Sequence, residues 1–282
     1  MRGKRLLPYW LLAPAAVWLF LFFLIPFLSL VATSLYDPSG SVLTGYRVSW
    51  HFANFGHVIQ EYGPHLWRAV WWALISTGLC LVLGYVLAYA IAFKVGRWKN
   101  LVLVMVVAPF FTSFLIRTDA WKLILADRGW VVHALQSVHL LSADGRLLAT
   151  PVAAIAGLTY NYLPFAILPL YASIEKLDQR LVEAAGDLYA SPLRAFAKVT
   201  LPLTMPGVVS ATLLTFIPAV GDYINATLLG STNDRVIGAD IQSLFTTTQD
   251  YASAGALSVI LLVVILLGTL VYVRKAGTEE LL

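Results

Sequence analysis

The sequence predicts an all-α integral membrane protein with six transmembrane helices. Only 12% of the 282 residues are charged and 59% are hydrophobic, and the mean hydropathy is +0.78. A typical soluble domain carries about 25% charged residues. The chain also contains uncharged runs long enough to cross a bilayer core, which takes about 20 apolar residues in a helix. A single membrane domain covering residues 1–282 accounts for the whole sequence.

Six uncharged runs provide the predicted spans. They are Leu6–Tyr36, Ala69–Phe93, Leu101–Ile116 (continuing towards Leu125), Leu147–Ile174, Val199–Gly221 and Tyr251–Val273. The first run is longer than the apolar region of a cleaved signal peptide, about 7–15 residues, so we expect it to be retained. Residues 37 to about 66 are expected to form a loop, and Gly129–Ala143 a helix at the membrane interface.

The distribution of basic residues predicts the orientation. With the amino terminus inside, 12 of the 19 Lys and Arg residues fall on the inner side. Because cytoplasmic loops are enriched in Lys and Arg, both termini are expected in the cytoplasm. The segment between the fourth and fifth spans then lies on the same side.

That segment, residues 175–202, is predicted to form two short helices with a bend between them. Asp178 can cap the first helix, Gln179 to about Leu188. Ser191 before Pro192 predicts the start of the second, since the serine hydroxyl can accept an orphan amide and proline suits the first helical position. The small residues suit docking against another protein; the alternative is a solvated link between spans.

Glu183-Ala184-Ala185, followed by Val199-x-Leu201-Pro202, resembles the EAA loop of bacterial ABC importer permeases. The resemblance implies a type I importer permease fold (MetI-like) with cytoplasmic coupling helices that insert into an ATPase subunit. We therefore call residues 175–202 the EAA loop. The residues expected to contact the ATPase are Glu183, Ala184, Ala185, Gly186, Ser191 and Pro202.

Further stretches resemble the spermidine/putrescine permease subunits of the PotB/PotH type. They are Tyr160–Phe165, Leu168–Asp178, Pro109-Phe110, Leu115–Thr118, Ala120–Lys122 and Phe216–Gly221. The chain departs from that pattern at Tyr189, where glycine is usual, and at Asp119, where tyrosine is usual. If the bend requires a positive φ, Tyr189 adopts it at a cost of about 1–3 kcal/mol.

This second resemblance implies the partners and the cargo. The partners would be a second, PotC-like permease subunit, two ATP-binding subunits and an extracytoplasmic polyamine-binding protein, all at a prokaryotic inner membrane. The cargo would be a polyamine; ferric iron, opines and other small solutes stay open. The sequence lacks the phosphate-binding motif G-x-x-x-x-G-K-[ST], so ATP and magnesium are expected on the partner ATPase, with no cofactor and no enzyme activity on this chain. The dispersed basic residues do not favour nucleic acid.

Polar residues at membrane depth are the candidates for the substrate path. A charge in hydrocarbon costs several kcal/mol unless it is paired or hydrated. Carboxylates and aromatic faces can replace the water around an organic cation. The alternative role is structural, as a neutralising set at the interface or as hydrogen bonds between spans. The candidates are Asp222, Asp119, Tyr223, Tyr160, Asn161 and Tyr162.

Two other classes of membrane protein remain as alternatives. An ion-coupled secondary transporter or channel would more often show charges near mid-membrane and internal symmetry, which the sequence does not display. A membrane enzyme would need a convergent acid–base or metal set. The five histidines lack the i, i+4 spacing with an adjacent glutamate that a zinc hydrolase helix uses.

Overall fold

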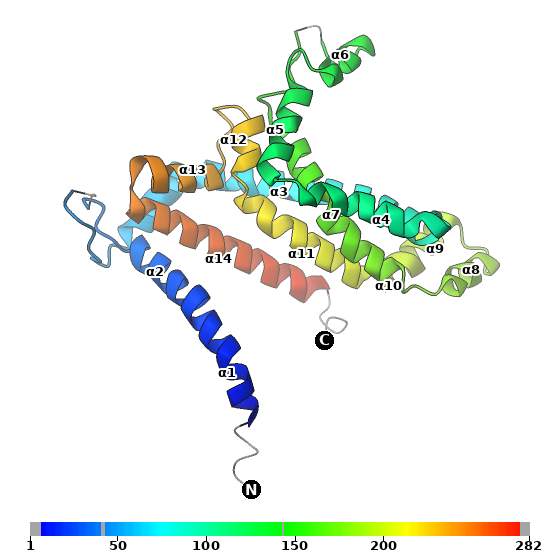
Figure 1. Ribbon diagram of the computed structural model, residues 1–282, viewed down its shortest axis with the longest axis horizontal. Helices are drawn as coiled ribbons and strands as arrows, with labels where there is room; N and C mark the ends of the chain where they lie inside the picture. The colour runs from blue at the N-terminus through cyan, green and yellow to red at the C-terminus, as the bar shows by residue number, and fades with distance from the viewer. Residues whose placement is uncertain (1–6, 41–42, 143, 277–282) are drawn as a thin grey trace. The chain divides into compact units, whose positions relative to one another are not determined.

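The computed structural model describes residues 7–40, 43–142 and 144–276. Within these ranges the chain is helical apart from turns, short connections and an isolated β-bridge between Tyr36 and Val48. The prediction of an all-α fold is confirmed (Figure 1). The long helices are α3 (Ala53–Phe93), α7 (Pro151–Ile174), α11 (Met205–Gly221) and α14 (Tyr251–Ala276).

Four helices among the described residues are long and apolar enough to cross a membrane, and six if each of two bent pairs forms one span. The first comprises α1 (Leu7–Leu19), the π-helical η2 (Phe20–Leu24) and α2 (Ile25–Ser34). The others are α3, α7 and α14. These segments match the predicted runs in number and order when the two bent pairs are counted.

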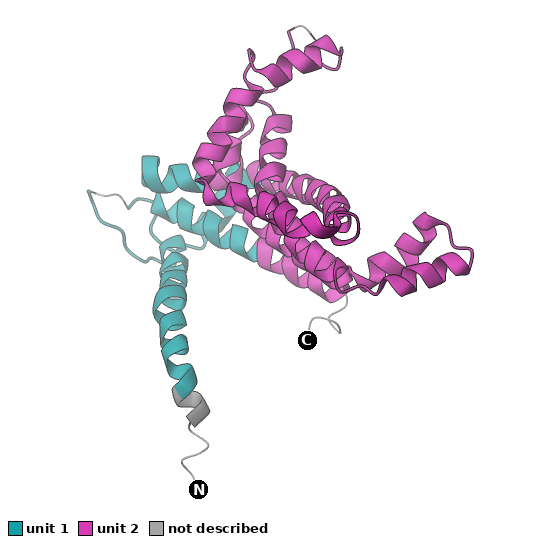
Figure 2. Cartoon of the chain, turned by 45° about the vertical axis from the view of Figure 1, so that its right-hand side comes forward, with its two compact units in different colours: residues 1–63, 240–263 teal, residues 64–239, 264–282 magenta. Residues whose placement is uncertain are grey.

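The residues group into two compact units (Figure 2). One unit consists of residues 1–63 and 240–263, and the other of residues 64–239 and 264–282. The first contains α13 (Ile237–Ser243) in part and the π-helical η6 (Leu244–Thr248). Both candidate sites described below lie in the second unit. The single membrane domain stays a prediction.

Helix α3 begins earlier than predicted. Residues 53–66 were expected to belong to a loop, but they are helical, so the loop shortens to residues 35–52. The Asn54 side chain donates to the carbonyl oxygens of Ser34 (3.1 Å) and Tyr36 (2.9 Å), which fixes the first turn of α3 to the end of α2. Hydropathy alone misses such a turn because it detects the apolar part of a helix and not its polar extension.

The third and fifth predicted spans are not straight. The third is a pair, Gly96–Phe111 and Phe114–Ser137, bent by 96°. It contains η3 (Gly96–Trp98), α4 (Lys99–Val107), η4 (Ala108–Phe111), α5 (Phe114–Leu125) and α6 (Trp130–Ser137). Pro109 lies in η4, just before the break at Thr112 and Ser113, and its carbonyl accepts the Thr112 hydroxyl at 2.7 Å. Proline removes an amide donor and interrupts the helical ladder. The helix expected at residues 129–143 is present in part, as α6, while its position at the membrane interface stays a prediction and residue 143 lies outside the described residues.

The fifth span bends by 71° between Pro192–Leu203 and Met205–Gly221. Pro202 and Pro206 flank the bend, and the Thr204 hydroxyl donates to the Thr200 carbonyl at 2.8 Å. Beyond it, α11 packs along α7 (Figure 1). A Cβ at Gly207 would lie 2.5 Å from Ser173 Cβ and 2.9 Å from the Pro169 carbonyl oxygen. Only a glycine allows this approach, as expected where small residues line helix contacts in membranes.

Candidate functional site

The EAA loop forms the predicted two helices. The first is α8 (Gln179–Asp187), and the Asp178 side chain accepts the Arg180 amide at 3.0 Å, as a cap does. The second consists of α9 (Pro192–Ala195), the π-helical η5 (Phe196–Thr200) and α10 (Leu201–Leu203). Ser191 does occupy the N-cap position, but its hydroxyl makes no capping bond. That part of the prediction is wrong, because the local turn is set by Pro192 and by the Ala195 amide donating to the Ser191 carbonyl at 2.9 Å.

The bend between these helices is a Schellman motif built on a tyrosine. The amide of Tyr189 donates to the Gly186 carbonyl (2.9 Å) and that of Ala190 to the Ala185 carbonyl (3.0 Å). The residue at this position must adopt the left-handed backbone conformation, and Tyr189 does so with φ of 61°. The conditional prediction for Tyr189 is therefore confirmed: a side chain is held where glycine is favoured.

The EAA loop presents its side chains outward. The predicted contact residues Glu183, Ala184, Gly186, Ser191 and Pro202 are exposed, and Ala185 is half-buried. Three large apolar side chains join them: Leu188, Tyr189 and Leu193 are 81%, 96% and 77% exposed. These side chains form an exposed apolar surface on a loop that also carries charges.

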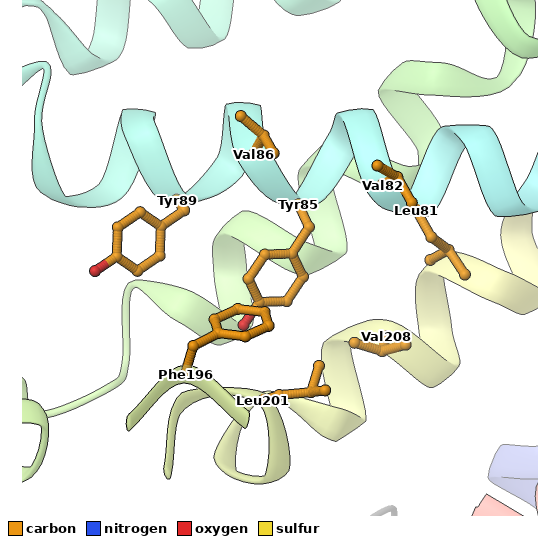
Figure 3. Close-up of a pocket in the computed structure, with 8 residues that line it drawn as sticks. All are labelled: Leu81, Val82, Tyr85, Val86, Tyr89, Phe196, Leu201 and Val208. Atoms are coloured by element: carbon orange, nitrogen blue, oxygen red, sulfur yellow. The ribbon is translucent and has the colours of Figure 1, made fainter. Parts of the chain in front are cut away.

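The second helix of the EAA loop is anchored to α3 by an aromatic contact. Phe196 packs edge-on against Tyr85 with ring centroids 5.3 Å apart, and the Tyr85 hydroxyl lies 2.7 Å from the Thr204 hydroxyl. Tyr85 and Phe196 border an apolar cavity of about 500 Å³ between α3 and residues 196–208 (Figure 3). No motif in the sequence points to this contact, because its members are more than 100 positions apart.

An ion pair ties the start of the EAA loop to the third span. The Lys99 ammonium donates to the Glu175 carboxylate and lies 5.3 Å from the centre of the Tyr171 ring. This hydrogen bond holds the pKa of the Glu175 carboxyl below its usual value. The carboxylate therefore stays charged at physiological pH, and both ends of the loop are attached to other spans.

The second candidate site surrounds Asp222, between α11 and α12 (Ile224–Leu229). The Tyr162 hydroxyl donates to Asp222 Oδ2 at 3.0 Å. The Asn225 side chain donates to the same oxygen at 2.8 Å, and the Asn225 amide donates to Oδ1 at 2.9 Å. Asp222 is thus both a cap for α12 and the centre of a polar cluster.

The cluster continues away from Asp222 into the protein. Asn161 donates to Asn225 Oδ1 at 3.1 Å and to the Thr118 hydroxyl at 3.2 Å, and all three residues are buried. Helices α5, α7 and α12 each contribute one of them. Gly157 makes room, since a Cβ there would lie 2.6 Å from Asn225 Oδ1. The sequence does not mark Asn225 or Gly157, and it marks Thr118 only as part of the stretch Leu115–Thr118; the contacts among these residues and Asn161 appear only in the structure.

Asp222 and Tyr162 also border a cavity of about 310 Å³. Its other lining residues are Phe114, Pro218, Gly221, Tyr223 and Ile224. We call it the Asp222 pocket. A carboxylate beside aromatic rings is a chemical environment suited to an organic cation.

The remaining predicted path residues lie elsewhere. Asn161 belongs to the buried cluster behind the Asp222 pocket and does not line it. Tyr160 packs against Trp121 with ring centroids 5.3 Å apart. Asp119 is exposed on α5 and is not among the pocket residues. The pocket therefore brings together Asp222, Tyr162 and Tyr223 and leaves out the other three.

Comparison with known proteins identifies relatives along almost the whole chain. PotB from Haemophilus influenzae, a spermidine/putrescine transport system permease protein, is 38% identical over 91% of this chain and 90% of its own length. The Escherichia coli protein of the same name is 36% identical over 92% of this chain and 94% of its own. The resemblance read from the sequence is confirmed.

A solved structure shares the fold at lower identity. A bacterial ABC transporter involved in the import of the acidic polysaccharide alginate contains a chain with a TM-score of 0.72 and 21% identity, covering 98% of this chain and 97% of that one. The model of the family described as "Binding-protein-dependent transport system inner membrane component" matches residues 5–275. This chain therefore belongs to the family of inner membrane components of binding-protein-dependent transport systems.

Proposed function

We propose that this chain is the membrane-spanning permease subunit of an ATP-driven importer of polyamines such as spermidine and putrescine. The observation that carries the proposal is 38% and 36% identity, over at least nine tenths of each chain, to proteins named as spermidine/putrescine permeases. Identity spread over the full length argues for a shared role in transport as well as a shared fold.

The Asp222 pocket supports the choice of an organic cation. Each carboxylate oxygen can accept more than one hydrogen bond, so Asp222 keeps capacity for an ammonium group beside Tyr162 and Asn225. Removing water from an amine costs several kcal/mol unless a carboxylate or an aromatic face replaces it. Tyr223, 39% exposed at the pocket, offers such a face.

The EAA loop is proposed to dock on an ATP-hydrolysing subunit that binds ATP and magnesium. The complete importer would contain two such subunits, a second, PotC-like permease and an extracytoplasmic polyamine-binding protein. One solved relative is a bacterial alginate ABC transporter in complex with an alginate-bound periplasmic protein, which supports an assembly of this kind. Both termini and the EAA loop would face the cytoplasm.

Uptake by the assembled importer tests the substrate. We expect radiolabelled spermidine or putrescine to accumulate, and Asp222→Asn to slow uptake severalfold while the complex still assembles. Asp127→Asn is the matched control, since Asp127 pairs with Arg146 outside the pocket. Uptake of an opine or ferric iron in place of polyamines by the wild-type complex would refute the proposal.

Coupling is tested at α8. Glu183→Ala removes an exposed carboxylate, and Ala184→Trp places a bulky ring where close approach is needed. Both should lower substrate-stimulated ATPase activity severalfold without unfolding the spans, whereas Asp187→Ala on the same helix serves as the control. Wild-type levels of substrate-stimulated ATPase activity in both variants would show that α8 does not contact the ATPase as proposed.

Orientation is tested by cysteine labelling in a Cys80→Ala chain. Leu188→Cys in the EAA loop should react with a membrane-impermeant thiol reagent only after the cells are opened. Thr232→Cys, in the connection after α12, should react in intact cells. Labelling of Leu188→Cys from outside would reverse the proposed topology.

A further inference from the structure

A guanidinium group lies among aromatic rings next to the Asp222 pocket. Arg117, in the first turn of α5, places its guanidinium carbon 4.8 Å from the centre of the Phe110 ring and 5.7 Å from that of Phe114. Phe110 precedes the break in the third span and Phe114 follows it. The break therefore brings two rings around a single cation.

These rings are the main partners that the described residues offer to Arg117. Its Nε atom is buried without a hydrogen-bond partner, and no carboxylate of the described chain lies within ion-pair distance. Cation–π attraction is strongest where the cation has lost water. The aromatic pair thus stabilises a cation without a fixed counter-charge.

One of the two rings lines the Asp222 pocket, and the other is linked to it through further aromatic contacts. Phe114 lines the pocket with Tyr162 and Asp222. Phe110 packs edge-on against Phe165 at 5.0 Å, and Phe165 lies 6.3 Å from the Tyr162 ring. The aromatic surface is therefore continuous from Phe110 to the carboxylate.

We propose that Phe110 and Phe114 form an ammonium-binding subsite that Arg117 fills in this state and vacates for one amine of the substrate. The inference rests on the proposed function. A second amine of the same molecule would meet Asp222 in the adjoining pocket. Arg117 would then act as a built-in competitor: the substrate binds only to the fraction of molecules whose rings are free, so its apparent affinity is reduced by that fraction.

Uptake kinetics of single variants test the competition. Arg117→Gln should lower the KM for spermidine about threefold or more, because the rings become free. Phe110→Leu and Phe114→Leu should each raise KM about threefold, since leucine fills similar space without the ring's negative face. Lys122→Gln is the charge-matched control, because Lys122 is an exposed cation on the same helix. The KM of this variant for spermidine should equal that of the wild-type complex.

Combining the variants separates the aromatic effect from a general loss of positive charge. In a chain carrying both Phe110→Leu and Phe114→Leu, Arg117→Gln should no longer lower KM. The proposal is overturned if Arg117→Gln raises KM in an assembled complex, if Lys122→Gln lowers KM equally, or if the effect of Arg117→Gln persists without the rings.

A second readout does not depend on the substrate. In a Cys80→Ala chain with Tyr223→Cys in the pocket, cationic and anionic thiol reagents of similar size report local cation binding. Arg117→Gln should raise the cationic-to-anionic rate ratio about threefold, and the two leucine substitutions should cancel that gain. If the wild-type complex takes up no polyamine, the proposed function is refuted but the subsite is not. If Arg117→Gln leaves the cationic-to-anionic rate ratio unchanged, the proposed subsite is refuted.

Discussion

The EAA loop and the Asp222 pocket are organised in opposite ways. The loop turns its side chains outward, with Leu188, Tyr189 and Leu193 each more than three-quarters exposed. The polar cluster behind the pocket turns its side chains inward: Thr118, Asn161 and Asn225 are buried, and Asn161 donates to the other two. The loop leaves its apolar side chains free for the ATPase contact that we propose, whereas the cluster joins buried polar groups of three helices, although Asn161 Oδ1 keeps no hydrogen-bond partner. Substitutions in the loop should therefore affect partner coupling, and substitutions in the buried cluster should affect folding.

The largest stability effect is expected at Asn225. Asn225→Leu removes the donor to Asp222 Oδ2 and the acceptor for Asn161. Each buried polar group left without a partner costs about 1–3 kcal/mol, so we expect a loss of about 3 kcal/mol and a lower thermal midpoint of the purified complex. Thr227→Val, on an exposed position of the same helix, should leave the midpoint nearly unchanged. A stable Asn225→Leu complex would mean that the cluster contributes little to folding.

A pair of glycines compares the two regions directly. An alanine Cβ at Gly157 would meet Leu229 Cδ1 at 2.3 Å and Asn225 Oδ1 at 2.6 Å, whereas at Gly186 it would meet nothing within 4 Å. Gly157→Ala should destabilise the protein by about 1–3 kcal/mol through overpacking. Gly186→Ala should be neutral or stabilise α8 by up to about 1 kcal/mol. The thermal unfolding midpoints of the two variants test this difference in stability. Equal midpoints would contradict it.

The smallest effect is expected at Tyr189. Tyr189→Gly removes the left-handed strain and should stabilise the bend by about 1 kcal/mol. The measurable sign is slower hydrogen exchange at the Ala190 amide, which closes the Schellman motif on Ala185. Because the exposed tyrosine ring is lost at the same time, ATPase coupling should not improve in parallel. Faster exchange would show that the ring itself holds the bend.

The two regions also differ in how far the sequence predicts them. The EAA loop follows from local signals: Asp178 as a cap, Pro192 at the start of a helix and a bend near Tyr189. Within the pocket, Asp222 could be named because it interrupts a run of apolar residues. Tyr162 and Asn161 could be named as polar residues of the fourth span, but their contacts could not, since Asn161 bonds to residues 43 and 64 positions away. Composition and periodicity report on neighbours along a helix, not on which faces of three helices meet.

The bends in the third and fifth spans escaped prediction for a related reason. Hydropathy measures how apolar a run is, and Gly96–Phe111 with Phe114–Ser137 passes that test as a pair despite a 96° bend. The proline that initiates the break, Pro109, is visible in the sequence. Proline within a membrane helix is tolerated when neighbouring groups satisfy the freed backbone, so its presence alone does not decide between a continuous and a broken span.

The break in the third span determines how displacement can pass along it. Thr112 and Ser113 have extended backbone, with ψ of 152° and 139°, so α4 and α5 do not form one elastic rod. Lys99 at the start of α4 is attached to Glu175 at the entrance of the EAA loop, while Thr118 in α5 is attached to Asn161. A displacement of the EAA loop that moves α4 is therefore passed to α5 through the extended residues Thr112 and Ser113. The pocket end can change its tilt without the twist that a continuous helix would transmit.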